Sequence, residues 1–360
     1  MKLIRLILDR LYKVPVLNKA EPLIEAVDAA LFGTDETTRV APHMVDSIDT
    51  KRYMSCAIAA LVPAALASIY FYGLRAIMII AVSYIAGFSV EIIFAVVRKH
   101  KIHEGFLVTG LIFPLVLPPT TPLWVVAVGV MFGVLFGKEM FGGTGRNIFN
   151  PALVGRLFIT IAFPAIMTTS WLMPITDATF SEKWLTPFAD TTITDAITSA
   201  TPLAEYKTTG VMPSIVDLLV GRTAGSMGET CRLAIIAGGL FLMFTRVSNW
   251  RIPVCYIGTV FLFALTGNHF LPERIAPPVF QVFSGGLLFG AMFMATDPVT
   301  SPFTKAGKYS FGISCGVLTV LIRSFSGYVE GVMFSIVIMN ALTPLIDHIV
   351  LMIKYRPAKQ

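Results

Sequence analysis

A glycine-rich stretch at residues 138–156, KEMFGGTGRNIFNPALVGR, brings together side chains that suit a polar, planar ligand. Its glycines let a planar group approach the backbone closely. Asn147 and Asn150 offer paired hydrogen-bond donors and acceptors, as the pyrimidine edge or ribityl chain of a flavin requires. Arg146 and Arg156 favour a ligand further. Asn150 followed by proline is also typical of a capped helix start, so the residue types leave both interpretations open.

Three carboxylates lie in or beside apolar segments. Glu91 lies within YIAGFSVEIIFAVV, Asp347 within MNALTPLIDHIVLM, and Asp297 follows a short apolar segment and precedes a proline. For Glu91 and Asp347, an ionised carboxylate in hydrocarbon is costly, so it normally faces the interior of a helix bundle and serves an ion or proton path. Asp297 could instead be a polar ligand that lines a cavity at a broken helix. Carboxylate oxygens also suit hard cations such as Na⁺. The structural alternatives are an ion pair or an interfacial position for Glu91 and Asp347, and a turn cap for Asp297.

The composition indicates the environment of these side chains. Of the 360 residues, 55% are hydrophobic and 14% are charged, and the mean hydropathy is +0.74. Soluble domains carry nearer a quarter charged residues, so most soluble enzymes and disordered proteins are excluded and a polytopic membrane protein is favoured. The net charge of +6 fits cytoplasmic loops and lipid headgroup contacts, and it forms no basic stripe that would indicate a nucleic acid partner. The four cysteines form no CxxC pair, which disfavours a metal site.

The chain divides into five regions. Residues 1–52 begin with a basic amphipathic pattern, which predicts a cytoplasmic or interfacial helix on the membrane or on a partner protein. Residues 171–229 form the longest polar stretch, and residues 353–360 form a tail. The other two regions, 53–170 and 230–352, contain ten apolar segments. Several of these segments are shorter than a full membrane span and are broken by proline. We place these segments at 53–73, 75–97, 105–118, 122–137, 151–170, 230–247, 252–268, 277–295, 308–322 and 329–352.

Basic residues set the expected orientation. They concentrate in the turns after the second, sixth and eighth segments and at the C-terminus. If all ten segments cross the membrane, these three turns and the C-terminus lie on the same side of it. The positive-inside rule identifies that side as cytoplasmic. Both termini are therefore expected inside, and residues 171–229 outside.

A possible internal repeat follows from two markers. The FGxxxG stretch at 132–137 recurs at 311–316, and the proline-broken turns at Pro119 and Pro298 share the same offset. Two copies of five segments, 53–170 and 230–352, would have opposite orientations. We therefore predict an all-α polytopic membrane protein of about ten transmembrane helices in two inverted five-helix repeats with broken helices. Such a fold also suits a passive solute channel of the urea type, and the FGxxxG match alone can arise by chance.

At three motifs the chain resembles NqrB, a membrane component of the Na⁺-translocating NADH:quinone reductase. They are residues 138–156, VRKHKIHEGFLVTGLIFPLVLPPTTPLW at 97–124 and FMATDPVTSPFTKAGK at 293–308. The related RnfD component of the Rnf complex, which serves ferredoxin:NAD oxidoreduction, shares the fold and some motifs. The resemblance implies a multi-pass component of a six-subunit complex in the bacterial inner membrane. Electrons would pass from a covalent FMN through riboflavin to ubiquinone, coupled to outward Na⁺ translocation.

The resemblance also implies site residues. In the family a D-x-x-[ST]-G-A-T pattern carries FMN through its phosphate, attached by a flavin transferase. Asp195, Thr198 and Thr201 match this pattern, with Thr201 as the attachment residue, and Ser199 replaces the usual glycine. The composition alone indicates that Thr201 is part of a solvent-exposed turn.

Further residues follow from the same resemblance. Riboflavin is assigned to Arg146, Asn147 and Asn150. Asp297 joins the predicted cofactor-binding residues because of its own position at a broken helix, and not through the resemblance. Quinone is assigned to Gly87 and Phe88, because the family's quinone site lies beside a glycine pair of which Gly87 is the matching member. Glu91 and Asp347 match acidic positions linked to sodium uptake.

Overall fold

The computed structural model of the protein describes residues 50–99, 105–169, 171–174 and 200–355. Within these ranges the regular structure is helical and contains no β-strand. Most of the predicted N-terminal region, the tail beyond residue 355, and Asp195 and Thr198 of the FMN pattern lie outside the described residues. The all-α prediction is confirmed for the described part of the chain.

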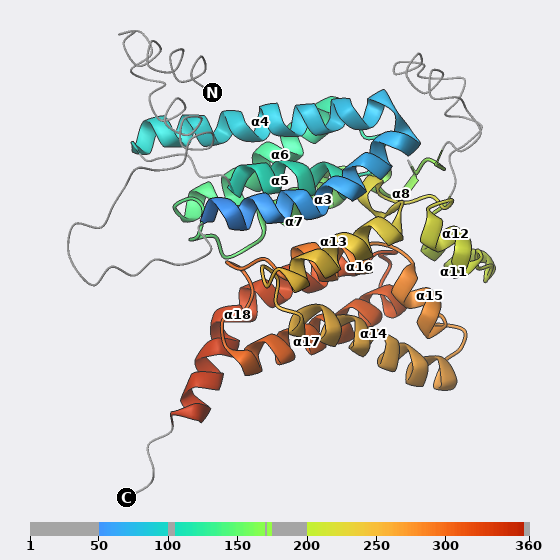
Figure 1. Ribbon diagram of the computed structural model, residues 1–360. Coiled ribbons are helices and arrows are strands. Elements are labelled where there is room, and N and C mark those ends of the chain that lie inside the picture. Colours follow the sequence, from blue (N-terminus) through green and yellow to red (C-terminus); the bar gives the residue numbers. More distant parts are fainter. Residues whose placement is uncertain (1–49, 100–104, 170, 175–199, 356–360) are drawn as a thin grey trace, which may run out of the picture.

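The N-terminal half packs as one group of helices, coloured blue to green in Figure 1. Helix α4 lies against α5 and α6, and α6 also packs on α7. Glycines allow the last contact, because a Cβ atom at Gly133 would lie 2.4 Å from the carbonyl oxygen of Pro151. The elements are α3 (Thr50–Tyr72), α4 (Leu74–Arg98), α5 (Gly105–Leu115), α6 (Leu123–Gly137), the 3₁₀ turn η2 (Glu139–Phe141), α7 (Pro151–Ala162) and α8 (Pro164–Thr169).

The C-terminal half forms a second group, coloured yellow to red, in which α17 packs between α14 and α18. Contacts of α13 with α3 and of α18 with α7 join the two groups. The elements are α11 (Pro202–Thr209), α12 (Ile215–Val220), the 3₁₀ turn η3 (Met227–Glu229), α13 (Arg232–Phe244), α14 (Arg251–Phe270), α15 (Pro278–Phe283), α16 (Leu287–Phe289), the π-helical turn η4 (Gly290–Met294), α17 (Lys305–Phe325) and α18 (Val332–Lys354).

Each of the ten predicted apolar segments contains helix, although not each contains a long one. Among the described residues, five helices are long and apolar enough to cross a membrane: Tyr53–Tyr72, Leu74–Arg98, Leu123–Phe141, Arg251–Phe270 and Val332–Lys354. Three shorter apolar helices, α5, α7 and α13, accompany them. The segment at 151–170 is divided at Phe163, before Pro164, and the segment at 277–295 is divided into α15, α16 and η4. At the predicted proline-rich turns, α5 ends at Leu115 and α6 begins at Leu123, and η4 ends at Met294 and α17 begins at Lys305.

The two FGxxxG stretches both lie at close helix crossings, but they face different partners. Gly133 of α6 meets α7, the helix that follows it. Gly312 of α17 meets α14, where a Cβ atom would lie 2.9 Å from the carbonyl oxygen of Ile252. The sequence match therefore reflects a shared need for close packing, although the glycines of the two stretches contact different neighbouring helices.

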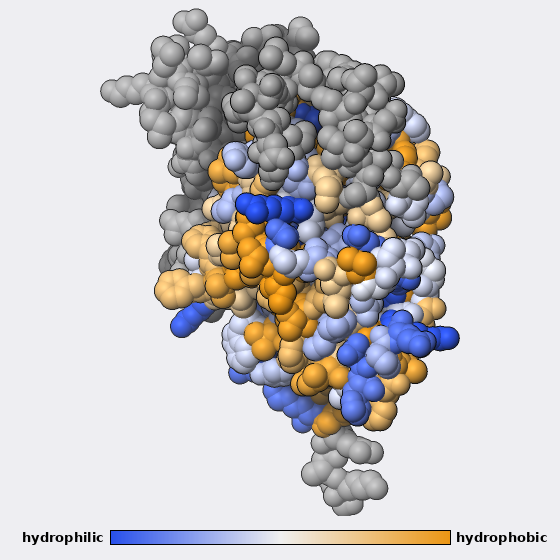
Figure 2. Space-filling view, turned by 90° about the vertical axis from the view of Figure 1, so that its right-hand side faces the viewer, coloured by the Kyte–Doolittle hydropathy of each residue, from blue (hydrophilic) through white to orange (hydrophobic). Residues whose placement is uncertain are grey.

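The helix ends define two opposite faces of the molecule. Helices α4, α6, α13 and α18 end, and α14 and α17 begin, on the left in Figure 1, while α11 and α12 lie on the right. The left end carries Arg98, Lys138, Arg246, Arg251 and Lys354. The right end faces the viewer in Figure 2, where hydrophilic and hydrophobic residues are mixed, as expected for surface near a membrane–water interface.

Candidate functional site

Thr201 lines a cavity at the right-hand end of the molecule, which we call the Thr201 cavity. It encloses about 320 Å³, within the range of pockets that hold small ligands. Its walls come from α7, α8, the start of α11, the turn at η3 and the connection between α17 and α18. They combine aromatic and apolar side chains, among them Met167, Trp171, Tyr328 and Phe334, with charged ones.

Thr201 is the N-cap of α11. Its Oγ1 accepts a hydrogen bond of 3.3 Å from the backbone N–H of Ala204, and Pro202 occupies the first helical position. A phosphoryl group on this oxygen would lie at a helix N-terminus, where free backbone N–H groups favour anions. The sequence alone suggested a solvent-exposed turn, whereas the structure gives Thr201 a half-buried position on a cavity wall.

Lys207 fixes α11 against the second group of helices. Its Nζ donates to the backbone carbonyls of Ser326 and Tyr328, at 3.3 Å and 2.9 Å. Burial, followed by repulsion from Arg323, lowers the pKa of Lys207. These bonds hold the helix that carries Thr201 against the connection between α17 and α18, which forms another wall of the cavity.

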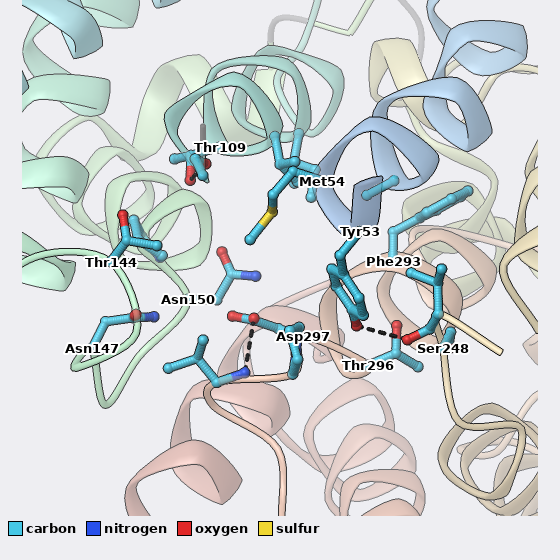
Figure 3. A pocket seen from close by; sticks show the side chains of 18 of the residues that line it. Tyr53, Met54, Thr109, Thr144, Asn147, Asn150, Ser248, Phe293, Thr296 and Asp297 are labelled. Carbon is cyan, nitrogen blue, oxygen red and sulfur yellow. Dashed lines mark hydrogen bonds between the residues drawn. The ribbon is translucent and has the colours of Figure 1, made fainter. Parts of the chain in front are cut away.

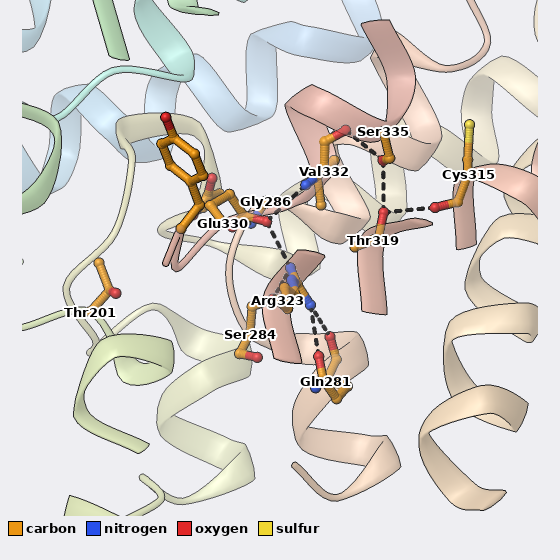
Figure 4. Close-up of polar contacts among 12 residues, drawn as sticks. Thr201, Gln281, Ser284, Gly286, Cys315, Thr319, Arg323, Glu330, Val332 and Ser335 are labelled. Atoms are coloured by element: carbon orange, nitrogen blue, oxygen red, sulfur yellow. Dashed lines mark hydrogen bonds and ion pairs between the residues drawn. The ribbon is translucent and has the colours of Figure 1, made fainter. Parts of the chain in front are cut away.

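Two arginine–glutamate pairs surround the Thr201 cavity. Arg323 of α17 donates to Glu330 at 3.0 Å and to the carbonyls of Gln281 and Ser284 (Figure 4). Glu330 also accepts from the backbone N–H of Gly286 at 2.9 Å. The second pair joins Arg156 of α7 to Glu229 of η3 more loosely, at 3.9 Å.

Arg156 is the polar side chain that a ligand would best satisfy. It is only 4% exposed, and its Nη1 has no hydrogen-bond partner among the residues that the structure describes. The cavity thus offers a hydroxyl for attachment, aromatic walls and a buried arginine whose Nη1 has no hydrogen-bond partner among the described residues. These features fit an FMN whose phosphate is bonded to Thr201.

The second cavity lies at the opposite end, and we call it the Asn147 cavity. It brings together three predicted cofactor-binding residues, Asn147, Asn150 and Asp297, from the loop before α7 and the turn after η4 (Figure 3). Met54 of α3 and Thr109 of α5 are among the other residues that line it. Phe293 reaches it from the π-helical turn, a rare element that frequently occurs at functional sites.

The polar groups of the Asn147 cavity have partners within the chain. The Oδ1 of Asn150 accepts from the N–H of Ala152 at 3.0 Å, which confirms the predicted N-cap. Asn147 donates to the carbonyl of Phe149 at 3.1 Å. Asp297 accepts from the N–H of Val299 and the hydroxyl of Thr300, as a turn cap does. Burial raises the pKa of Asp297.

The residue types of the Asn147 cavity therefore suit riboflavin, but the volume of the cavity does not. The Asn147 cavity encloses about 90 Å³, well below the roughly 300 Å³ at which ligand pockets begin. A flavin ring could enter only if the cavity widened.

The two arginines of the 138–156 stretch do not line this cavity. Arg146 is exposed and packs its side chain against Gly142. Arg156 lies in the Thr201 cavity. The assignment of riboflavin to Arg146, Asn147 and Asn150 stays a prediction. Arg156, which together with Arg146 suggested a ligand, lies apart from the asparagines because the helical path of α7 carries it away from the loop.

Glu91 lies beside the Asn147 cavity in an ion pair. Its carboxylate contacts the Nζ of Lys138, and the two side chains are only 5% and 4% exposed. Lys138 itself lines the cavity. The predicted quinone residues lie nearby on α4: Gly87 is buried against Val130 of α6, and Phe88 stacks on Phe106 with ring centroids 4.6 Å apart.

Asp347 binds the start of another helix. Its carboxylate accepts from the backbone N–H groups of Phe303 and Thr304, at 3.0 Å and 3.1 Å, and from the Thr304 hydroxyl. Thr304 is the N-cap of α17. Glu91 and Asp347 thus both have structural partners, and they lie in different groups of helices.

Three charged residues in the two cavities were not predicted from the sequence. Glu229 and Glu330 line the Thr201 cavity, and Lys138 neutralises Glu91. Each lies near a helix end, where a charged residue normally suggests a solvated boundary. For Glu330 the available signal was Arg323, because an arginine inside an apolar helix requires a buried acceptor.

Comparison with known proteins identifies the family. A family profile described as NQR2, RnfD, RnfE matches residues 37–356. The NqrB component of the Na(+)-translocating NADH-quinone reductase of Klebsiella pneumoniae is 34% identical over 93% of this chain and 92% of its own length. The proteins of the same name from Pseudomonas aeruginosa PAO1 and Azotobacter vinelandii are 36% identical, over 92% and 91% of this chain and the same shares of their own lengths. The five long apolar helices agree with a multi-pass membrane protein. The chain therefore belongs to the NQR2, RnfD, RnfE family.

Proposed function

We propose that this chain is the NqrB component of a Na⁺-translocating NADH:quinone reductase and that it carries FMN on Thr201. The observation that supports this most is the pair of cavities at opposite ends of one helix bundle. One contains Thr201 with an unsatisfied buried arginine, and the other contains Asn147, Asn150 and Asp297. Two separated flavins would need two such sites.

The residues of the Thr201 cavity have distinct roles in this proposal. Thr201 supplies the attachment oxygen, and the N-terminus of α11 receives the phosphate. Trp171, Tyr328 and Phe334 enclose the ring system and exclude water. A bound FMN supplies one-electron and two-electron transfer, and the chain fixes its position and electrostatic surroundings. Asp195 and Thr198 complete the pattern for the flavin transferase.

The opposite end is assigned to riboflavin, quinone and the start of the Na⁺ path. Asn147, Asn150 and Asp297 would bind the polar edge of riboflavin once the cavity widens, and Gly87 and Phe88 would border ubiquinone. Glu91 and Asp347 are candidates for Na⁺ uptake because their carboxylate groups are buried in a protein with few charged residues, and carboxylate oxygens can bind Na⁺. Their structural partners mean that uptake would exchange a protein contact for the ion.

The topology completes the proposal. Ten helices in two inverted repeats would place the basic helix ends and both termini in the cytoplasm, and residues 171–229 on the outer side of a bacterial inner membrane. The regions would be 1–52, 53–170, 171–229, 230–352 and 353–360. The chain would act within a six-subunit complex.

The proposed function is tested on the chain purified within its native complex and denatured in SDS. A flavin bound covalently remains with the chain and fluoresces under ultraviolet light. We expect fluorescence when the flavin transferase is present and none when it is absent. A dark band in the presence of the transferase would contradict the proposal. The family also includes RnfD, so reduction of ubiquinone by NADH, rather than exchange between ferredoxin and NAD, identifies the quinone reductase.

A further inference from the structure

We propose that Arg156 binds the edge of the flavin ring in the Thr201 cavity and stabilises the negative charge that the ring gains on reduction. Arg156 thereby sets the midpoint potential of this flavin. The proposal rests on the FMN attachment at Thr201 and assigns a role to a residue that the attachment pattern does not contain.

The first support is the unsatisfied state of the Arg156 side chain. It is 4% exposed, and its Nη1 finds no acceptor among the residues described. Glu229 lies 3.9 Å away, beyond hydrogen-bond distance. A buried charged donor without an acceptor is costly. Arg156 lines the same cavity as Thr201, so an acceptor on a ligand attached there would remove that cost.

The second support is the charge around the cavity. Three buried arginines, at 156, 232 and 323, accompany two carboxylates, Glu229 and Glu330. Arg323 bonds Glu330 directly. Arg232 interacts electrostatically with Glu229 and donates to the carbonyl of Leu218. Glu229 is thus shared between two arginines, and the cluster is suited to accept one further negative charge.

The flavin ring is a better partner for Arg156 than the phosphate. The phosphate on Thr201 would lie at the N-terminus of α11, whereas Arg156 projects from α7, a different wall. The pyrimidine edge of the ring presents N1 and a carbonyl oxygen as adjacent acceptors, which match the planar donor fork of a guanidinium. Adding one electron without a proton leaves one negative charge on this edge. In the complex the electron comes from a reduced flavin of another component, which is oxidised by one electron.

The test is a redox titration of the covalent FMN in the purified complex, with dithionite as reductant and the visible spectrum as readout. Arg156→Gln removes the cation, and we expect a more negative midpoint potential. Each tenfold loss of preference for the reduced ring corresponds to about 59 mV for a one-electron couple. Glu229→Gln removes the competing carboxylate, and we expect a shift in the opposite, positive direction. Arg156→Lys keeps the charge and should give a smaller negative shift than Arg156→Gln.

Arg222→Gln is the matched control. Arg222 is exposed, lies at the same end of the molecule and faces Asp217 at 3.9 Å, so its loss should leave the potential unchanged. Equal intensity of covalent flavin fluorescence shows that each variant is folded and loaded. An unchanged potential in loaded Arg156→Gln, or shifts of the same sign in Arg156→Gln and Glu229→Gln, would overturn the proposal. Loss of flavin attachment in Arg156→Gln and Arg156→Lys, with Glu229→Gln at the wild-type potential, would assign Arg156 to the phosphate instead. A wild-type chain without covalent flavin would contradict the proposed function itself.

Discussion

Asn150 caps α7 and Arg156 lies within α7, yet each lines a different cavity. Asn150 caps the helix on the Asn147 cavity, and Arg156 follows six positions later on the Thr201 cavity. A helix rises 1.5 Å per residue, so roughly 9 Å of α7 separates the two Cα atoms. One short helix therefore joins the two sites to which we assign flavins.

Asn150 has a structural and a proposed binding role, and these can be separated. Asn150→Ala removes the N-cap of α7, and we expect it to lower the free energy of unfolding by about 1 kcal/mol. Asn150→Ser keeps a capping oxygen but not the amide, so we expect near-normal stability with less riboflavin bound. The measurements are thermal unfolding and extracted riboflavin per complex. Full riboflavin content in both variants would exclude Asn150 from the site.

The Glu91–Lys138 pair distinguishes a structural carboxylate from an ion ligand. Glu91→Gln leaves Lys138 buried without its charge partner, and we expect a loss of about 3–5 kcal/mol of stability. Combining it with Lys138→Met should recover most of that loss. If Glu91 also serves Na⁺ uptake, the double variant regains stability but still requires more Na⁺ for half-maximal quinone reduction. Recovery of both properties would show that Glu91 is only structural.

Asp347 holds the start of α17, so its loss should affect stability as well as transport. Hydrogen bonds to a charged group contribute about 1.5–3 kcal/mol, and Asp347 accepts three. We expect Asp347→Asn to lower the unfolding temperature and to raise the Na⁺ concentration required for half-maximal rate. His348→Gln, at an exposed neighbouring position, is the control and should change neither. An unchanged Na⁺ requirement in Asp347→Asn would remove Asp347 from the ion path.

The orientation can be tested by labelling from one side of the membrane. Thr208 of α11 is exposed at the end of the molecule that carries Thr201, and Lys354 ends α18 at the other. In whole cells with a permeabilised outer membrane, we expect an impermeant maleimide to label Thr208→Cys but not Lys354→Cys. The wild-type chain, with its four cysteines, gives the background. The reverse pattern would invert the topology.

Local features of the structure could be predicted from the sequence, and packing could not. The cap at Asn150 and the breaks before Leu123 and after Met294 follow from proline and asparagine chemistry, which acts over a few residues. The partner of Glu91 could not be predicted, because α4 and the end of α6 meet only in the folded bundle. The position of Arg156 could not be predicted for a related reason. It lies close to Asn150 in the sequence, but α7 carries it to the wall of the other cavity.

The most direct test of the account is in-gel flavin fluorescence of Thr201 variants, made with the flavin transferase. Thr201→Ala removes the attachment oxygen, and we predict an assembled complex in which this chain is dark. Thr201→Ser keeps a hydroxyl and a capping oxygen at the attachment position. Thr208→Ala is the control, because it removes a threonine hydroxyl from the exposed face of the same helix. Thr208→Ala should fluoresce like the wild type. Fluorescence that persists in Thr201→Ala would contradict the account.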